Sequence, residues 1–222
     1  SGNHAILEWM IKNLSGSNER HVIKHSLITS GNSCYLNAIN EYNQSPSLFI
    51  DYHFAKSTYK NFVVSYEDVS DKYETDYTRS FKKVVILRDI INVVASRYQK
   101  ILSGDPRFRI LNINNFFFQN WIDHASSATR GVQIIKFEDW VSSKETRDEI
   151  AKELNCVNID NIGTISHHGD GSSFSGISHV PSANELSNRW KQVNLPDEII
   201  EIINNPIISK LRAQHGYEPL NK

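Results

Sequence analysis

The chain alternates between short apolar runs of strand length and longer segments in which apolar residues recur every three to four positions. The run 84–87 (VVIL) is continuous and mostly β-branched, which is typical of a strand buried on both faces. Further strands are predicted at 21–28, 48–54, 62–69 and 132–137. Helices are predicted at 3–14, 90–102, 114–128, 144–154, 184–192, 197–204 and 206–214.

This alternation predicts an α/β fold with a mostly parallel central sheet and helices on both faces. At 222 residues the chain fits a single domain, and no internal repeat or linker divides it. Aromatic residues are expected to fill the core, namely Trp9 in the first helix and Phe116, Phe117 and Trp121 in the helix at 114–128.

Composition narrows the function classes. A formal net charge of −1 argues against a broad nucleic-acid-binding face, which needs a basic excess. Cys34 and Cys156 cannot form a disulfide framework, so a reducing compartment is expected. With no apolar run near the ~20 residues of a membrane span and no leader peptide, we expect a cytoplasmic protein without a membrane span. The histidines at 167, 168 and 179 fit no zinc spacing, so no metal is predicted.

Two segments have the chemistry of an anion site. The small-residue turn that begins Ser1-Gly2-Asn3-His4 leads into a helix, where backbone N–H groups and the helix dipole favour a phosphate or sulfate. Arg88 ends the strand at 84–87, and Ser96 follows eight positions later in the next helix. Ligands gather at the carboxyl ends of strands in open α/β sheets, and arginine suits phosphate. The alternatives are an ordinary helix cap and an Arg88 neutralised by a neighbouring carboxylate such as Asp89.

The run 84–98 resembles the 3′-phosphate-binding segment of sulfotransferases that use 3′-phosphoadenosine-5′-phosphosulfate (PAPS). That segment is an apolar strand, then Arg-Asp-Pro and a serine eight positions after the arginine; Ile90 replaces the proline here. The opening residues resemble the 5′-phosphosulfate loop, residues 133–139 (QIIKFED) the strand that ends in Tyr-Glu-Asp, and Arg189-Trp190 with the following tail the C-terminal helices. The family usually carries Arg-Lys-Gly in the loop at 163–179, and this chain does not.

The resemblance implies a P-loop-like sulfotransferase fold over residues 1–222, with the first strand and the start of the phosphosulfate loop expected before Ser1. It implies PAPS as co-substrate, adenosine 3′,5′-bisphosphate as product, and no metal. The residues that it places at the nucleotide are Ser1, Gly2, Asn3, His4, Ala5, Arg88, Ser96, Phe137, Ser173 and Phe174.

Family members place a His or Glu general base at the end of the strand before the arginine-bearing one. In this chain Glu67 occupies that position, and His53 and then His25 are the alternatives. The acceptor is expected to be a small molecule or glycan held by loops, for which 29–47 and 103–113 are candidates.

Two other functions fit the same pattern. A P-loop small-molecule kinase shares the fold and anion cradle but expects Gly-x-x-x-x-Gly-Lys-Ser/Thr, which the chain lacks. A catalytically inactive binding module would keep the nucleotide pocket without transferring a group.

Overall fold

The structure, a computed structural model, describes residues 2–15, 21–24, 27–30, 33–37, 61–65, 82–106, 109–110, 113–157 and 182–220. The chain divides into two compact units that alternate along the sequence. The hairpin unit comprises Gly2–Lys83 and Ser143–Thr164, and the helical unit comprises Ser1, Val84–Ser142 and Ile165–Lys222. A single domain over 1–222 remains a prediction.

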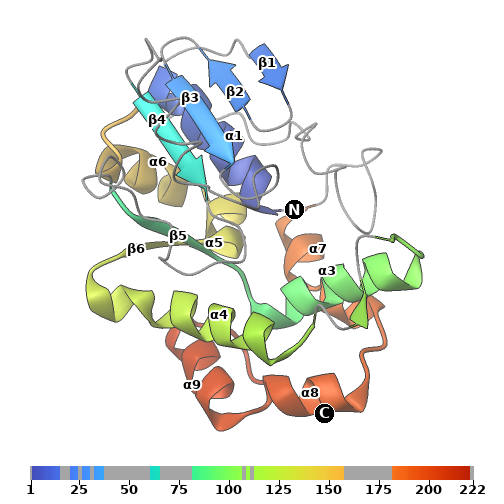
Figure 1. Cartoon of the computed structure of the whole chain (residues 1–222). Helices are drawn as coiled ribbons and strands as arrows, with labels where there is room; N and C mark the ends of the chain where they lie inside the picture. The colour runs from blue at the N-terminus through green and yellow to red at the C-terminus, as the bar shows by residue number, and fades with distance from the viewer. Residues whose placement is uncertain are drawn as a thin grey trace. The chain divides into compact units, whose positions relative to one another are not determined.

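In the part of the hairpin unit that the structure describes, a four-stranded sheet is accompanied by α1 and α6 (Figure 1). Its elements are α1 (Gly2–Ser15), β1 (His21–Lys24), β2 (Leu27–Ser30), β3 (Ser33–Asn37), β4 (Asn61–Ser65) and α6 (Lys144–Glu153). The strands lie in the order β1-β2-β3-β4; β1, β2 and β3 are antiparallel neighbours, and β3 and β4 are parallel.

Helix α1 packs against β2, β3 and β4. Its predicted apolar face is confirmed at Ile6, Leu7 and Met10, which are buried, and Trp9 also lies in the core as expected. The buried Asn13 side chain donates a hydrogen bond to the Trp9 carbonyl at 2.6 Å. This bond satisfies a polar group that would destabilise the fold if it were buried without a partner.

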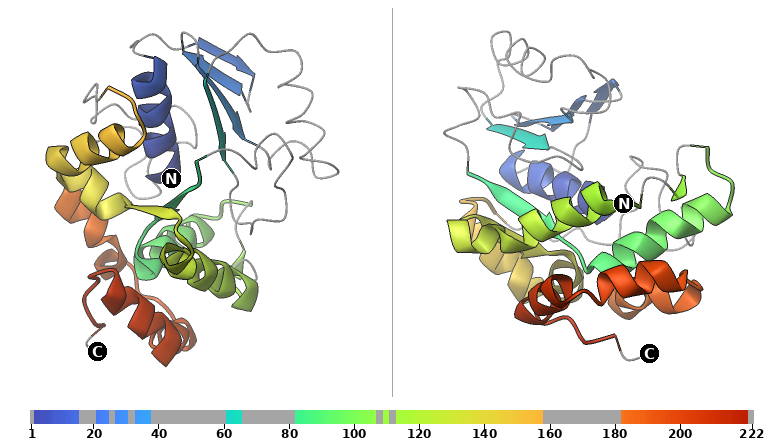
Figure 2. Two further views of the ribbon diagram at one scale, coloured as in Figure 1. Left: turned by 90° about the vertical axis from the view of Figure 1, so that its left-hand side faces the viewer. Right: turned by 60° about the horizontal axis from the view of Figure 1, so that its bottom comes forward.

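The helical unit contains two parallel strands among its helices (Figures 1 and 2). Its elements are β5 (Val84–Leu87), α3 (Ile90–Leu102), α4 (Asn115–Ala125), η3 (Ser126–Arg130), β6 (Gln133–Lys136), α5 (Phe137–Ser142), α7 (Ala183–Ser187), η4 (Arg189–Gln192), α8 (Asp197–Ile203) and α9 (Pro206–Gln214). Apolar residues of β5, α3, α4, α8 and α9, and of the segments just before α4 and α8, form one core. Its buried members are Leu87, Ile90, Ile91, Val94, Ile113, Phe117, Phe118, Trp121, Ala125, Leu195, Ile199, Ile200, Ile203 and Ile208.

Helix boundaries in this unit follow polar side chains that cap the first turn. Asp89 accepts a hydrogen bond from the Ile91 N–H, Asn114 from the Phe117 N–H, and Asn205 from the Ile207 N–H. Each satisfies a donor that has no partner within its own helix, which stabilises the start of that helix by about 1 kcal/mol. The predicted helices at 90–102 and 206–214 therefore begin where the sequence placed them. Their last residues also agree with the prediction.

The fold is mixed α/β with mostly helices, as the alternation predicted in its coarse form. The described strands form two sheets, and the hairpin of β1, β2 and β3 is antiparallel, so they do not make the one mostly parallel sheet expected. The run predicted at 21–28 is split between β1 and β2, and β3 lies inside 29–47, where a loop was expected.

Three expectations about individual residues were wrong. β5 is not buried on both faces: only Leu87 is buried, and the three residues before it are half-buried. Phe116 is 62% exposed because it faces away from the core that Phe117 and Trp121 join. Phe137 begins helix α5 instead of ending a strand.

No helix among the described residues has the length and apolar character needed to cross a membrane.

Candidate anion-binding site

The parallel pairing of β5 and β6 brings the residues that follow the two strands close together. Leu87 is in register with Lys136, so Arg88 and Asp89 leave the sheet beside Phe137 and Glu138. The Arg88 guanidinium carbon lies 5.2 Å from the centroid of the Phe137 ring, and the Asp89 N–H donates to Glu138 Oε1 at 3.2 Å. The carboxyl ends of adjacent parallel strands are where α/β proteins assemble ligand sites.

Asp89 is held by Arg212 of α9. The Arg212 Nε and Nη2 atoms donate to Asp89 Oδ1 and Oδ2 at 2.8 and 2.9 Å, a bidentate pair in which both side chains are buried. The sequence left open that Asp89 neutralises Arg88. Both Asp89 oxygens are hydrogen-bonded to Arg212, and the carboxylate nearest to Arg88 is that of Glu138, so the alternative in which a carboxylate balances the charge of Arg88 holds for Glu138.

Arg88 is buried with unused hydrogen-bonding capacity. It is 9% exposed, and within the described residues its Nε and Nη2 atoms have no hydrogen-bond partner. Glu138 Oε1 lies 3.9 Å from Nε, which attracts the charge but is too long for a hydrogen bond. Burial lowers the pKa of Arg88, and the charge of Glu138 opposes that change. A buried cation with two unsatisfied donors is unfavourable unless an anion satisfies them.

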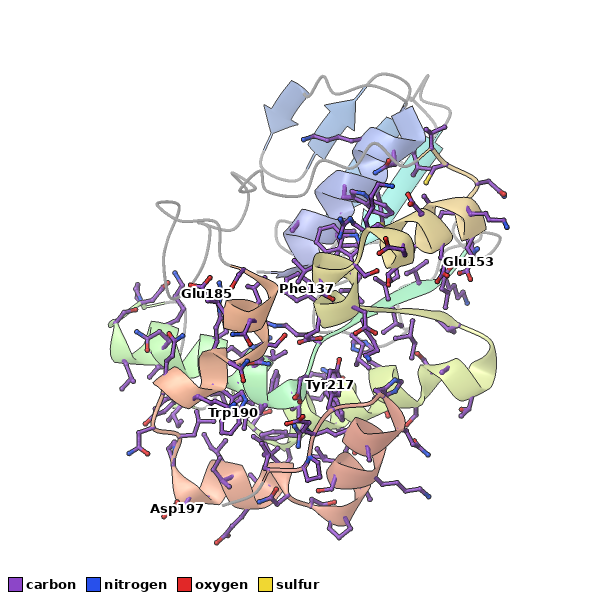
Figure 3. All side chains as sticks on the ribbon, turned by 180° about the vertical axis from the view of Figure 1, so that it is seen from behind. Phe137, Glu153, Glu185, Trp190, Asp197 and Tyr217 are labelled. Atoms are coloured by element: carbon purple, nitrogen blue, oxygen red, sulfur yellow. The ribbon has the colours of Figure 1, made fainter. Side chains whose placement is uncertain are left out.

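Two contacts hold the arginine in place. The Trp121 indole Nε1 donates to the Arg88 carbonyl at 2.9 Å, which ties the end of β5 to α4. The Tyr217 hydroxyl donates to Glu138 Oε2 at 3.1 Å, which fixes the carboxylate beside the guanidinium. Figure 3 labels Phe137 at the start of α5 and Tyr217 in the segment after α9. The backbone of Arg88 and the neighbouring Glu138 carboxylate are thus each held by a hydrogen bond.

Glu138 combines burial with three polar neighbours. Burial raises its pKa, and the charge of Arg88 together with backbone hydrogen bonds opposes that rise. Burial and the adjacent Glu138 also raise the pKa of Tyr217, so that residue keeps its proton and acts as the donor. A carboxylate in this position can balance the charge of Arg88 while leaving its Nε and Nη2 donors for another acceptor.

We expect the Glu138 pKa to be visible in the pH dependence of stability. Because the pKa of Glu138 is raised in the native state, the folded protein binds a proton on its carboxyl group more tightly than the unfolded chain does. Glu138 therefore stabilises the fold below its ordinary pKa of 4.5. That contribution is lost as pH rises from 4.5 through the raised native pKa. Wild-type protein should therefore lose free energy of unfolding relative to Glu138→Gln over this range, as measured by urea denaturation from about pH 4 to about pH 7. A difference that stays constant with pH would show that the native pKa is not raised.

Among the predicted site residues, the structure describes part of the set. Arg88 and Phe137 come together, and Ser96 is half-buried within α3, about 9 Å along the helix axis from Ile90 at a rise of ~1.5 Å per residue. Gly2, Asn3, His4 and the half-buried Ala5 belong to α1 in the hairpin unit. Ser1, the three candidate bases Glu67, His53 and His25, and Ser173 and Phe174 lie outside the described residues.

The predicted contact between Phe137 and an adenine ring remains a prediction. The Phe137 side chain is 4% exposed and stacks on Trp140 with 6.1 Å between ring centroids and an interplanar angle of 26°. In this structure the ring therefore packs in the interior and lies against Arg88.

Sequence reasoning missed Glu138, Arg212 and Tyr217 as parts of this site. Glu138 had a usable signal, because it follows a second predicted strand and carboxyl ends of parallel strands meet at one edge. Arg212 and Tyr217 had no such signal, since each is far from residues 88–89 in sequence and reaches the site only through the packing of α9 and the segment that follows it.

No group of three or more His, Cys, Asp or Glu side chains that could hold a metal ion occurs among the residues that the structure describes.

No protein-family model matches the chain, and the searches of curated proteins and of solved structures also gave no match.

Proposed function

We propose that this protein is a PAPS-dependent sulfotransferase with a P-loop-like α/β fold, and that Arg88 binds the 3′-phosphate of the donor nucleotide. The observation that carries the proposal is the buried Arg88 with two unsatisfied guanidinium donors at the carboxyl end of β5. It is supported by the resemblance of residues 84–98 to the phosphate-binding segment of that family, and by the parallel pairing of β5 with β6.

The proposed reaction is an in-line transfer of a sulfuryl group. A hydroxyl or amine of the acceptor attacks the sulfur, and the bond between sulfur and the bridging oxygen of the 5′-phosphosulfate breaks. The electron pair of that bond stays on the phosphate, and adenosine 3′,5′-bisphosphate leaves. The acceptor proton passes to a general base, for which Glu67 is the first candidate and His53 the second; such a base typically contributes about 10²–10⁴-fold.

Arg88 contributes by position and charge. Trp121 holds the backbone of Arg88, and Phe137 and Glu138 lie beside its guanidinium, so little reorganisation is needed when the nucleotide binds, which is the condition under which buried donors hold a phosphate strongly. The donor is then oriented by its non-reacting end, and its sulfur can be presented to the acceptor.

The direct test is a thermal-shift titration with adenosine 3′,5′-bisphosphate, adenosine 5′-monophosphate, and ATP with and without magnesium. We expect the bisphosphate to raise Tm without metal and the monophosphate, which lacks the 3′-phosphate, to raise it much less. Stabilisation by ATP with magnesium alone would instead identify a kinase.

Activity separates the enzyme from an inactive binding module. The protein is incubated with PAPS labelled on sulfur and a panel of hydroxyl- and amine-bearing small molecules and glycans. Transfer of label to any acceptor, with release of the bisphosphate, is the expected result. Tight binding of the bisphosphate with transfer to none of them would support the inactive module.

A further inference from the structure

A further buried arginine, Arg189, lies beside the N-terminal turn of α3, in a segment that the sequence did not place at the site. Arg189 belongs to η4 and is 6% exposed, and η4 packs against α3, whose N-cap residue Asp89 directly follows Arg88. Burial and then the charge of Arg88 lower the pKa of Arg189 to about 10, against the opposing charge of Glu185. Two interior cations that repel one another are stabilised by an anion that contacts both.

Asn92 fixes this segment on α3. Its Nδ2 donates to the Ser187 carbonyl at 2.8 Å, and its Oδ1 accepts from the Trp190 N–H at 3.3 Å, so both hydrogen bonds flank Arg189. Asn92 is itself buried and lies in the first turn of α3, four residues after Arg88. The backbone that carries Arg189 is therefore held at the N-terminal turn of α3; Figure 3 labels the adjoining Trp190.

We infer that Arg88 and Arg189 bind one phosphate monoester dianion together, and that Asn92 is the positioning residue that sets the second arginine. The Nε and Nη2 atoms of Arg88 are the unsatisfied, buried donors that point to this ligand. A phosphate group offers three acceptor oxygens and two negative charges, which suit two guanidinium groups better than a carboxylate does. That the two arginines bind a phosphate group does not depend on the proposed function. Only the identification of that group as the 3′-phosphate of a nucleotide rests on it.

The test compares wild-type protein with Arg189→Met and with Lys191→Met, an exposed cation of the same η4 segment. The probes are adenosine 3′,5′-bisphosphate, adenosine 5′-monophosphate and inorganic phosphate, and the readouts are calorimetric affinity and the Tm increase on ligand addition. Arg189→Met should weaken bisphosphate binding roughly tenfold or more, reduce the Tm response to phosphate, and leave monophosphate binding unchanged. Lys191→Met should bind all three as wild type does.

Two further variants keep the test decisive if Arg189→Met folds poorly. Arg189→Lys keeps the charge and should recover part of the lost affinity. Asn92→Leu removes both hydrogen bonds and should weaken binding of the bisphosphate but not of the monophosphate. If Asn92 were merely structural, the substitution would weaken binding of both nucleotides or of neither.

The outcomes distinguish this inference from the proposed function. Wild-type and Arg189→Met proteins with equal responses to phosphate and to the bisphosphate would overturn the arginine pair while leaving the sulfotransferase proposal in place. A wild-type protein that responds to phosphate through both arginines but does not bind the bisphosphate would support phosphate binding by the arginine pair. It would overturn the proposal that the ligand is this nucleotide.

Discussion

Replacing Arg212 by methionine should lower the free energy of unfolding by about 3–5 kcal/mol, because it leaves a buried carboxylate without its partner. Arg212 is 3% exposed and supplies both hydrogen bonds to the Asp89 oxygens. Asp89 would still accept from the Ile91 N–H, but that single contact at 3.4 Å cannot offset the desolvation of its charge. Urea denaturation at neutral pH gives the difference directly.

Lys210→Met is the matched control for this prediction. Lys210 is exposed on the same helix α9, so the substitution removes the same charge with an expected change of within about 0.5 kcal/mol. Combining Arg212→Met with Asp89→Asn should recover part of the loss, because asparagine can still cap α3 and carries no charge to bury. If Arg212→Met were as stable as the control, the Asp89–Arg212 pair would contribute nothing to the stability of the fold.

Replacing Arg88 by methionine should abolish most of the affinity for adenosine 3′,5′-bisphosphate without a matching loss of stability. Loss of charge-assisted hydrogen bonds to a phosphate corresponds to about 2 kcal/mol or more, a decrease in affinity of roughly 30-fold. Glu138 loses its neighbouring cation in this variant, so Arg88→Met should also be measured with Glu138→Gln. In the double variant Arg88→Met/Glu138→Gln the free energy of unfolding should change little or rise, because the unliganded protein then buries neither a guanidinium with unsatisfied donors nor a carboxylate without a cation.

The control for Arg88 is Arg97→Met on α3. The Arg97 guanidinium carbon lies 4.4 Å from the centroid of the Phe117 ring, so its removal should cost some packing energy but leave nucleotide affinity unchanged. The ratio of the two effects is diagnostic: a structural arginine reduces stability when it is replaced, and a ligand-binding arginine reduces affinity. An Arg88→Met protein that is strongly destabilised yet binds the bisphosphate normally would identify Arg88 as part of the fold alone.

Local pattern was sufficient for several elements of the helical unit. The strand β5 and the helices α3 and α9 match their predicted bounds, because a polar cap or a change in apolar periodicity marks each end within the sequence. The prediction failed where the same local signal serves two structures. Phe137 follows an apolar run that is typical of a strand, yet it begins α5, in which Phe137 and Trp140 are buried three residues apart as in an amphipathic helix.

By itself, the sequence determined the α/β class, the placement of Arg88 at the end of a strand, and the start of α3 immediately after it. These are local properties, since periodicity and capping involve residues within one or two turns of each other. Only the tertiary structure decided that Asp89 meets Arg212, that Glu138 stands beside Arg88, and that Arg189 is held on α3 by Asn92. Each of those contacts joins elements that are distant in the chain, and which charge meets which depends on how strands and helices pack, which short-range pattern does not encode.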